Sequence, residues 1–193
     1  RDLTGDWSSD VCSSDLTQRI VNPEALSPHW LRLAHVLCSA AYRSAISSLS
    51  GIDLSIAPLE VNVFHYGPGA SLGPHVDLKD KLVTHILYFN ESWDVQNGGC
   101  LDILNSSDPD NVATVVTPVV GNSAVLVRSD TSWHAVSRVV EQCPSSRRSV
   151  TVTFYHPGSV SSMWPVDDQT PLHPYDDGRV VEAYKGEGVH GGA

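Results

Sequence analysis

Short strand-like runs dominate the chain between residues 52 and 155, and they constrain its fold more than any other feature. The runs are rich in Val, Ile, Leu, Thr and Tyr, and turn residues such as Gly, Pro, Asn and Asp separate them. They cover residues 52–56, 59–66, 74–78, 81–89, 99–104, 112–117, 123–128, 134–140 and 148–155. Many short strands with this punctuation are typical of a sandwich or barrel. We therefore predict a mainly β fold, a double-stranded β-helix (jelly roll) that brings strands distant in sequence together.

One helical pattern precedes the strands. Ser27 followed by Pro28 predicts a helix N-cap and first turn, and Gly51 predicts the helix end. Apolar residues recur between them with a period near 3.6, at Trp30, Leu33, Ala34, Leu37, Ala41, Ala45 and Leu49. We expect one N-terminal helix that packs its apolar stripe against a sheet.

The chain divides into four parts. Residues 1–16, which include DWSSDVCSSDL, resemble the conceptual translation of a sequencing adapter, so we exclude them from the fold. Residues 17–51 form the N-terminal helical segment that buttresses the sheet, and residues 52–156 form the jelly-roll core. Residues 157–193 are rich in Pro and Gly and are expected to form an extended C-terminal tail. The length left after the exclusion predicts one domain.

Composition limits the partners of the chain. The 22 acidic and 12 basic residues give a net charge of −10, which argues against tight binding of nucleic acid. No signal peptide or membrane-spanning run is visible, so we expect a cytoplasmic protein without membrane contact. Cys38, Cys100 and Cys143 lack metal-type or disulfide-type spacing and are expected to be free thiols. The oligomeric state is left open.

His75-Val76-Asp77 and the distant His134 are candidate metal ligands. Two imidazoles and one carboxylate can hold one face of an octahedral Fe(II) and leave the other face open. Because side chains alternate along a strand, His75 and Asp77 would project to the same side of the strand expected at residues 74–78. A His-x-Asp triplet arises by chance about once in a chain of this composition, so its context must support the assignment.

Arg147 is the candidate carboxylate-binding residue. Alternation along the last strand sends Arg147, Ser149 and Thr151 to one side, and Arg148 with three apolar residues to the other. The planar guanidinium of arginine suits a carboxylate, and Ser149 or Thr151 can serve as hydroxyl partners. We expect Arg148 to lie toward solvent, although the sequence does not exclude Arg148 as the carboxylate-binding residue.

The order of these motifs resembles the prolyl-4-hydroxylase-like family of Fe(II)/2-oxoglutarate-dependent dioxygenases. The resemblance extends over about residues 59–155 and rests on Tyr66 with its glycine-rich turn, His75-Val76-Asp77, Tyr88-Phe89-Asn90, Gly98-Gly99, Trp133-His134-Ala135-Val136 and Arg147-Arg148-Ser149-Val150-Thr151.

This resemblance implies Fe(II) bound by His75, Asp77 and His134, with no catalytic side chain beyond these ligands. It implies 2-oxoglutarate as co-substrate, bound by Arg147 with help from Tyr66 and Tyr88, O2 as oxidant, and ascorbate as a stimulant. The implied reaction is hydroxylation of an unactivated C–H bond, for which a prolyl or other amino-acid side chain of a peptide or small molecule is a reasonable substrate.

Two other classes remain as alternatives. A cupin-like metalloenzyme without a keto-acid co-substrate shares the barrel, but such sites usually contain three or four His, often as H-x-H, and no H-x-H occurs here. In that class Arg147 has no role. A non-catalytic ligand-binding jelly roll needs no iron-binding triad. Formation of succinate from 2-oxoglutarate separates the three classes.

Overall fold

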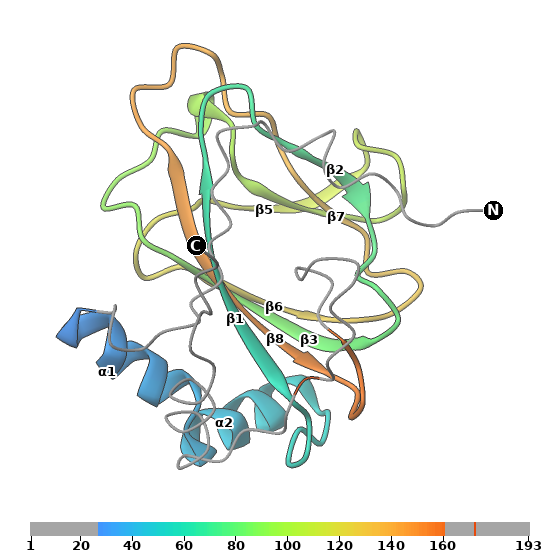
Figure 1. The fold of residues 1–193 in the computed structure, drawn as a ribbon. Coiled ribbons are helices and arrows are strands. Elements are labelled where there is room, and N and C mark those ends of the chain that lie inside the picture. The colour runs from blue at the N-terminus through green and yellow to red at the C-terminus, as the bar shows by residue number, and fades with distance from the viewer. Residues whose placement is uncertain (1–26, 161–171, 173–193) are drawn as a thin grey trace, which may run out of the picture.

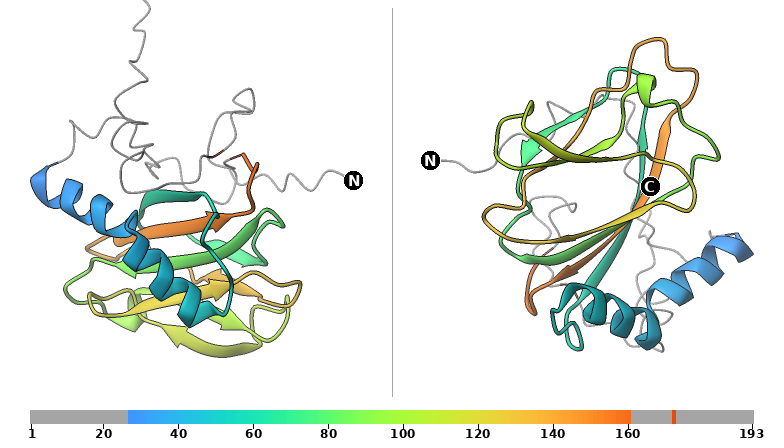
Figure 2. Two further views of the ribbon diagram at one scale, coloured as in Figure 1. Left: turned by 90° about the horizontal axis from the view of Figure 1, so that it is seen from below. Right: turned by 180° about the vertical axis from the view of Figure 1, so that it is seen from behind.

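Two antiparallel sheets face each other, and two helices cover the outer side of one sheet (Figures 1 and 2). The computed structural model describes residues 27–160 and Leu172. The elements are α1 (Pro28–Leu37), α2 (Ala40–Ser50), β1 (Leu59–Tyr66), β2 (Leu72–His75), β3 (Lys81–Tyr88), the 3-10 helix η2 (Val95–Asn97), β4 (Leu101–Leu104), β5 (Val112–Val116), β6 (Ser123–Val127), β7 (His134–Val136) and β8 (Arg147–Tyr155). The strand orders are β1-β8-β3-β6 and β2-β7-β4-β5. The predicted jelly roll is confirmed.

The expected single helix is wrong, because the chain forms two helices with a break at Ser39. Ser39 has an extended backbone, with φ −72° and ψ 151°, in the same region as the Ser27 cap at φ −62° and ψ 157°. Its hydroxyl accepts the Tyr42 N–H at 3.1 Å and donates to the Val36 carbonyl at 2.7 Å. A serine that satisfies backbone groups on both sides ends one helix and begins the next.

The helices pack against the apolar side of β8. Val150, Val152 and Phe154 are fully buried, and they form one core with Leu37 of α1 and Ile46 of α2. This is the apolar side that strand alternation predicts for β8. The polar side of the same strand therefore faces the space between the two sheets, where the candidate site lies.

The strand expected at residues 52–56 is wrong, since these residues form a connection with a turn. Arg43 is buried in the helix layer and donates to the carbonyls of Leu54 and Ala57. The Ser47 hydroxyl accepts the Leu54 N–H at 3.1 Å. Side chains of α2 thus satisfy backbone groups that a strand would have paired with a neighbouring strand.

The strand expected at residues 74–78 is displaced, because β2 runs from Leu72 and ends at His75. β2 is an edge strand, and its pairing with β7 contains a register shift between Leu72 and His75. Pro74, which has no N–H to donate, is tolerated at such an edge. After His75 the chain leaves its sheet and crosses to β3 of the other sheet.

Cys38, Cys100 and Cys143 are buried, and none of them forms a disulfide in the described part of the chain. Leu172, which lies in the expected C-terminal tail, is buried and donates its N–H to the Ser159 carbonyl at 2.8 Å. The segment 1–16 and most of the tail lie outside the described residues. No helix in the described part is long and apolar enough to cross a membrane.

Candidate metal centre

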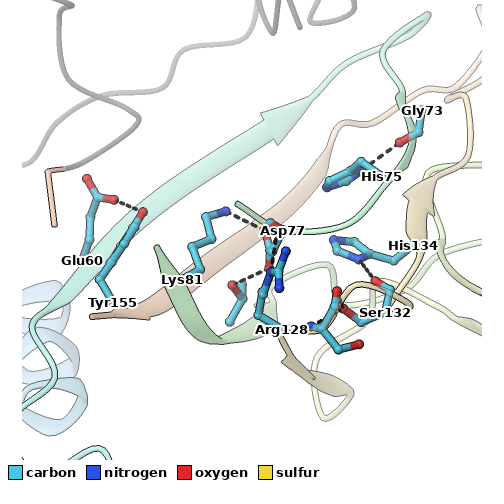
Figure 3. Close-up of polar contacts among 11 residues, drawn as sticks. Glu60, Gly73, His75, Asp77, Lys81, Arg128, Ser132, His134 and Tyr155 are labelled. Carbon is cyan, nitrogen blue, oxygen red and sulfur yellow. Dashed lines mark hydrogen bonds and ion pairs between the residues drawn. The ribbon is translucent and has the colours of Figure 1, made fainter. Parts of the chain in front are cut away.

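His75, Asp77 and His134 lie together between the sheets, with one ligand atom of each within 4.8 Å of the others (Figure 3). His75 at the end of β2 and His134 at the start of β7 are direct partners in the antiparallel register. Opposed residues on neighbouring strands project to the same side, and here the two ring centroids are 4.2 Å apart. The fold therefore brings together the three residues that the sequence nominates as ligands.

Each imidazole is oriented by a backbone carbonyl. Nδ1 of His75 lies 2.9 Å from the Gly73 carbonyl oxygen, and Nδ1 of His134 lies 3.0 Å from that of Ser132. A carbonyl oxygen only accepts, so Nδ1 carries the proton and Nε2 keeps its lone pair for a metal. Burial, and then the neighbouring His134, lower the pKa of His75 to about 4. His75 is therefore neutral, the form that binds metal, at ordinary pH.

Asp77 lies outside any strand, so the expectation that His75 and Asp77 project from one strand is wrong. It sits on the crossover between the sheets, and both carboxylate oxygens accept hydrogen bonds. Oδ1 lies 2.7 Å from the Lys81 ammonium, and Oδ2 accepts from the Thr84 hydroxyl at 3.0 Å. Burial by itself would raise the pKa of Asp77, but the Lys81 charge and these hydrogen bonds hold it below its usual value.

Two imidazoles and one ionised carboxylate fit Fe(II). The donor set is the one that non-haem iron oxygenases use to occupy one face of the metal. The orientation of both rings by carbonyls, and of the carboxylate by two donors, is the outer-shell support that metal ligands usually have.

Arg147 begins β8 and is buried, with only 3% of its surface exposed. Its NH1 donates to the Ser149 hydroxyl at 2.8 Å, and its guanidinium carbon lies 5.1 Å from the Tyr66 ring centroid and 5.2 Å from that of Tyr88. The side chain of Arg148 is on the opposite side of the strand and the residue is exposed. The structure thus places Arg147, and not Arg148, between the sheets.

Two polar atoms beside this guanidinium lack hydrogen-bond partners. The Nε of Arg147 and the hydroxyl of Tyr88 are both buried and unpaired. Burial raises the pKa of the Tyr88 hydroxyl, and the Arg147 cation opposes that rise. Buried donors without partners are rare and costly in a folded protein, so these two atoms are suited to an anionic ligand with carboxylate oxygens.

The metal ligands and the guanidinium share one inner face. Thr84, which holds Asp77, and Tyr88, which flanks Arg147, point to the same side of β3 because they are four residues apart. Their separation along the strand is about 13 Å. Thr151 faces the same space from β8, opposite Ile86, but it makes no hydrogen bond with Arg147 in the described contacts. A carboxylate bound at Arg147 would therefore lie on the same inner face as the three candidate metal ligands.

The sequence reasoning missed the residues that hold Asp77. Lys81 and Thr84 bind its carboxylate, and Nε of Arg128 donates to its backbone carbonyl at 3.3 Å. Thr84 could have been predicted to face the site, because Thr84 and Tyr88 are four residues apart and strand alternation points both to the same side. Lys81 is an odd number of residues from Thr84, so strand alternation would place its side chain on the side away from the site.

The comparisons with known proteins agree with this geometry. Residues 61–156 match the model of the 2OG-Fe(II) oxygenase superfamily. The chain belongs to this superfamily, and so to a class whose description names the metal and co-substrate that the site fits.

Individual proteins that the chain resembles are named as prolyl hydroxylases. The chain is 28% identical over 138 residues to the prolyl 3-hydroxylase OGFOD1 of Mus musculus. The matched segment covers 69% of this chain and 25% of that protein. It thus spans about a quarter of the length of this curated relative. A prolyl-4-hydroxylase of Pseudomonas putida superposes with a TM-score of 0.55 at 24% identity over 74% of this chain and 71% of that one.

A second solved structure is a prolyl hydroxylase of Trichoplax adhaerens in complex with a peptide fragment of the hypoxia inducible factor oxygen degradation domain. It superposes with a TM-score of 0.60 at 20% identity, over 80% of this chain and 69% of that chain. At these identities the two superpositions establish the shared fold.

Proposed function

We propose that this chain is an Fe(II)- and 2-oxoglutarate-dependent dioxygenase that hydroxylates an unactivated C–H bond. The observation that carries the proposal is the buried Arg147 guanidinium, whose Nε and neighbouring Tyr88 hydroxyl are unpaired, on the same inner face as the His75–Asp77–His134 group. A metal site by itself would fit many reactions. A metal site with a buried cation for a distant carboxylate fits a co-substrate with carboxylates at both ends.

The residues have separate roles in this proposal. His75, Asp77 and His134 hold Fe(II), which when bound supplies the oxidation of the substrate by O2 coupled to decarboxylation of 2-oxoglutarate. Arg147 and Ser149 bind the far carboxylate of 2-oxoglutarate, and the Tyr88 hydroxyl donates to it. The rings of Tyr66 and Tyr88 enclose the guanidinium on two sides and keep water from it.

A peptidyl proline is the substrate that the relatives favour. The curated relative is named as a prolyl 3-hydroxylase, and one solved relative is described with a bound peptide fragment. We propose a prolyl side chain of a peptide or protein, and the net charge of −10 argues against a nucleic-acid substrate.

The two alternatives explain less of the site. A cupin-like metalloenzyme without a keto acid leaves the buried guanidinium without a function, and a non-catalytic ligand-binding jelly roll leaves the His75–Asp77–His134 group without one. Keeping Arg147 buried without a carboxylate partner is costly, and an anionic co-substrate offsets that cost.

Succinate formation tests the proposal. The protein is incubated with Fe(II), ascorbate and 2-oxoglutarate, with and without proline-containing peptides, and succinate and peptide mass are measured. We expect succinate above background and the gain of one oxygen atom on a peptide. His134→Ala, which lacks one proposed ligand, is expected to form no succinate.

The proposal is refuted if the folded protein neither binds 2-oxoglutarate in the presence of metal nor forms succinate with any peptide. Succinate formation by His134→Ala at the parent rate would remove His134 from the proposed metal centre.

A further inference from the structure

We propose that Lys81 is a positioning residue that fixes the orientation of the Asp77 carboxylate for metal binding. The proposal rests on the metal centre proposed above. The Lys81 ammonium lies 2.7 Å from Asp77 Oδ1 (Figure 3). Both side chains are largely buried, with 14% and 6% exposed.

Asp77 needs such support because no strand holds it. His75 and His134 belong to paired strands, whereas Asp77 lies on the connection between the sheets. The contacts that hold it come from side chains: Lys81 on Oδ1, Thr84 on Oδ2, and Nε of Arg128 on its backbone carbonyl. A free aspartate samples several rotamers, and these contacts select one of them.

A bulge in β3 turns the Lys81 side chain toward Asp77. In the pairing of β3 with β8, Lys81 is opposite Tyr155 and Val83 is opposite Phe154, so the register shifts by one residue between them. Val83 shares the side of Phe154 that faces the helices, and Lys81 shares the side of Tyr155. Without the bulge Lys81 would point with Val83 into the apolar core. Bulges that re-aim one side chain are common next to active sites.

Arg128 supports the same carboxylate residue from the neighbouring strand. It follows β6, which pairs with β3, and its NH2 forms an ion pair with Asp130 at 2.7 Å while its Nε holds the Asp77 carbonyl. The backbone and the carboxylate of Asp77 are therefore fixed by two separate cations. This arrangement limits both the position of the residue and the direction of its oxygens.

The expected effect of losing Lys81 is a loss of metal affinity. Removing an outer-shell partner of a metal ligand typically weakens metal binding about 10- to 100-fold. The ammonium also repels a bound dication, which acts in the opposite direction. If positioning is the larger effect, Lys81→Met weakens metal binding. If charge repulsion is larger, Lys81→Met strengthens it.

The experiment measures Mn(II) affinity by the EPR signal of the free ion, without oxygen chemistry. We expect Lys81→Met to raise the Mn(II) Kd about tenfold or more, and Lys81→Arg, which keeps a charged donor, to restore most of the affinity. Lys79→Met is the matched control, because Lys79 is an exposed lysine two residues away on the same connection. At saturating metal, the 2-oxoglutarate requirement should change less than about threefold in each variant, since Arg147 is untouched.

Thr84→Val supplies a second measurement that leaves the buried ion pair intact. It removes the donor to Oδ2 and keeps the side-chain shape, and we expect a several-fold rise in the Mn(II) Kd. The inference is overturned if folded Lys81→Met, or Thr84→Val where Lys81→Met does not fold, binds Mn(II) as tightly as the parent or more tightly. A parent that does not bind Mn(II) overturns the metal centre itself, which separates the two failures.

Discussion

Replacing Arg147 with methionine should weaken 2-oxoglutarate binding while leaving the ligand-free protein as stable or more stable. The guanidinium is 3% exposed, and no carboxylate of the described residues forms an ion pair with it. A buried charge without an opposite charge is expensive, so an apolar side chain of similar length at this position should not destabilise the ligand-free protein. Cation–π contacts with the Tyr66 and Tyr88 rings offset part of this cost, by about 0.5–2 kcal/mol each.

The loss of binding follows from the contacts that Arg147 offers. A charge-assisted hydrogen-bonded pair contributes about 1.5–3 kcal/mol, which corresponds to roughly 10- to 150-fold in affinity. We therefore expect Arg147→Met to weaken 2-oxoglutarate binding to the Mn(II)-loaded protein by at least about tenfold, with the Mn(II) affinity unchanged. The free energy of unfolding of the ligand-free protein should stay the same or rise.

Isothermal titration calorimetry with 2-oxoglutarate and urea unfolding of the metal-free protein supply the two measurements. Arg148→Met is the matched control, since Arg148 lies next along β8 with its side chain exposed on the other side. Parent-like 2-oxoglutarate binding by Arg147→Met would refute the assignment, and weakened binding by Arg148→Met alone would transfer it to Arg148. A loss of several kcal/mol of stability in Arg147→Met would show that the guanidinium is a structural element of the core.

Two further predictions concern stability. Burial lowers the pKa of His75 to about 4, so the unfolded state takes up a proton near pH 6.5 and the folded state does not. The free energy of unfolding of the metal-free protein should therefore fall by about 2 kcal/mol between pH 7.5 and 5. Urea unfolding of His75→Gln should show a flatter pH dependence. An equal slope in both proteins would contradict this. At Gly98, with φ +68°, an added Cβ would lie 1.9 Å from the Arg138 carbonyl oxygen, so Gly98→Ala should cost about 2 kcal/mol or more. Gly121→Ala, with φ +94° and open space, should cost only the backbone strain, and equal losses in thermal unfolding would disprove the steric argument.

Local periodicity explains what could be predicted about the fold. Val150, Val152 and Phe154 pack under the helices, and Arg147 and Ser149 face the other way, as alternation along β8 requires. The helix ends at Ser27 and Gly51 could be predicted because cap residues are recognised from the local sequence. The break at Ser39 was not, since the apolar stripe continues through it and only the hydroxyl contacts reveal the cap.

The failures near the site share one physical cause. A single inserted residue in a strand reverses the side to which the preceding residues point, and no local pattern marks the insertion. The register of β2 shifts between Leu72 and His75, and β2 ends before Asp77. The shift between Lys81 and Val83 turns Lys81 inward. Both depend on which distant strand each segment meets.

The sequence by itself determined the strand-rich class, the two sides of β8 and the chemical types of the candidate ligands, because these follow from residue identity and steps of two along the chain. Only the tertiary structure decided that His75 and His134 are opposite one another, that Asp77 sits between the sheets, and that Lys81, Thr84 and Arg128 hold it. Contacts between segments far apart in sequence are selected by the burial of whole sheet faces against each other, and that selection is made across the fold as a whole.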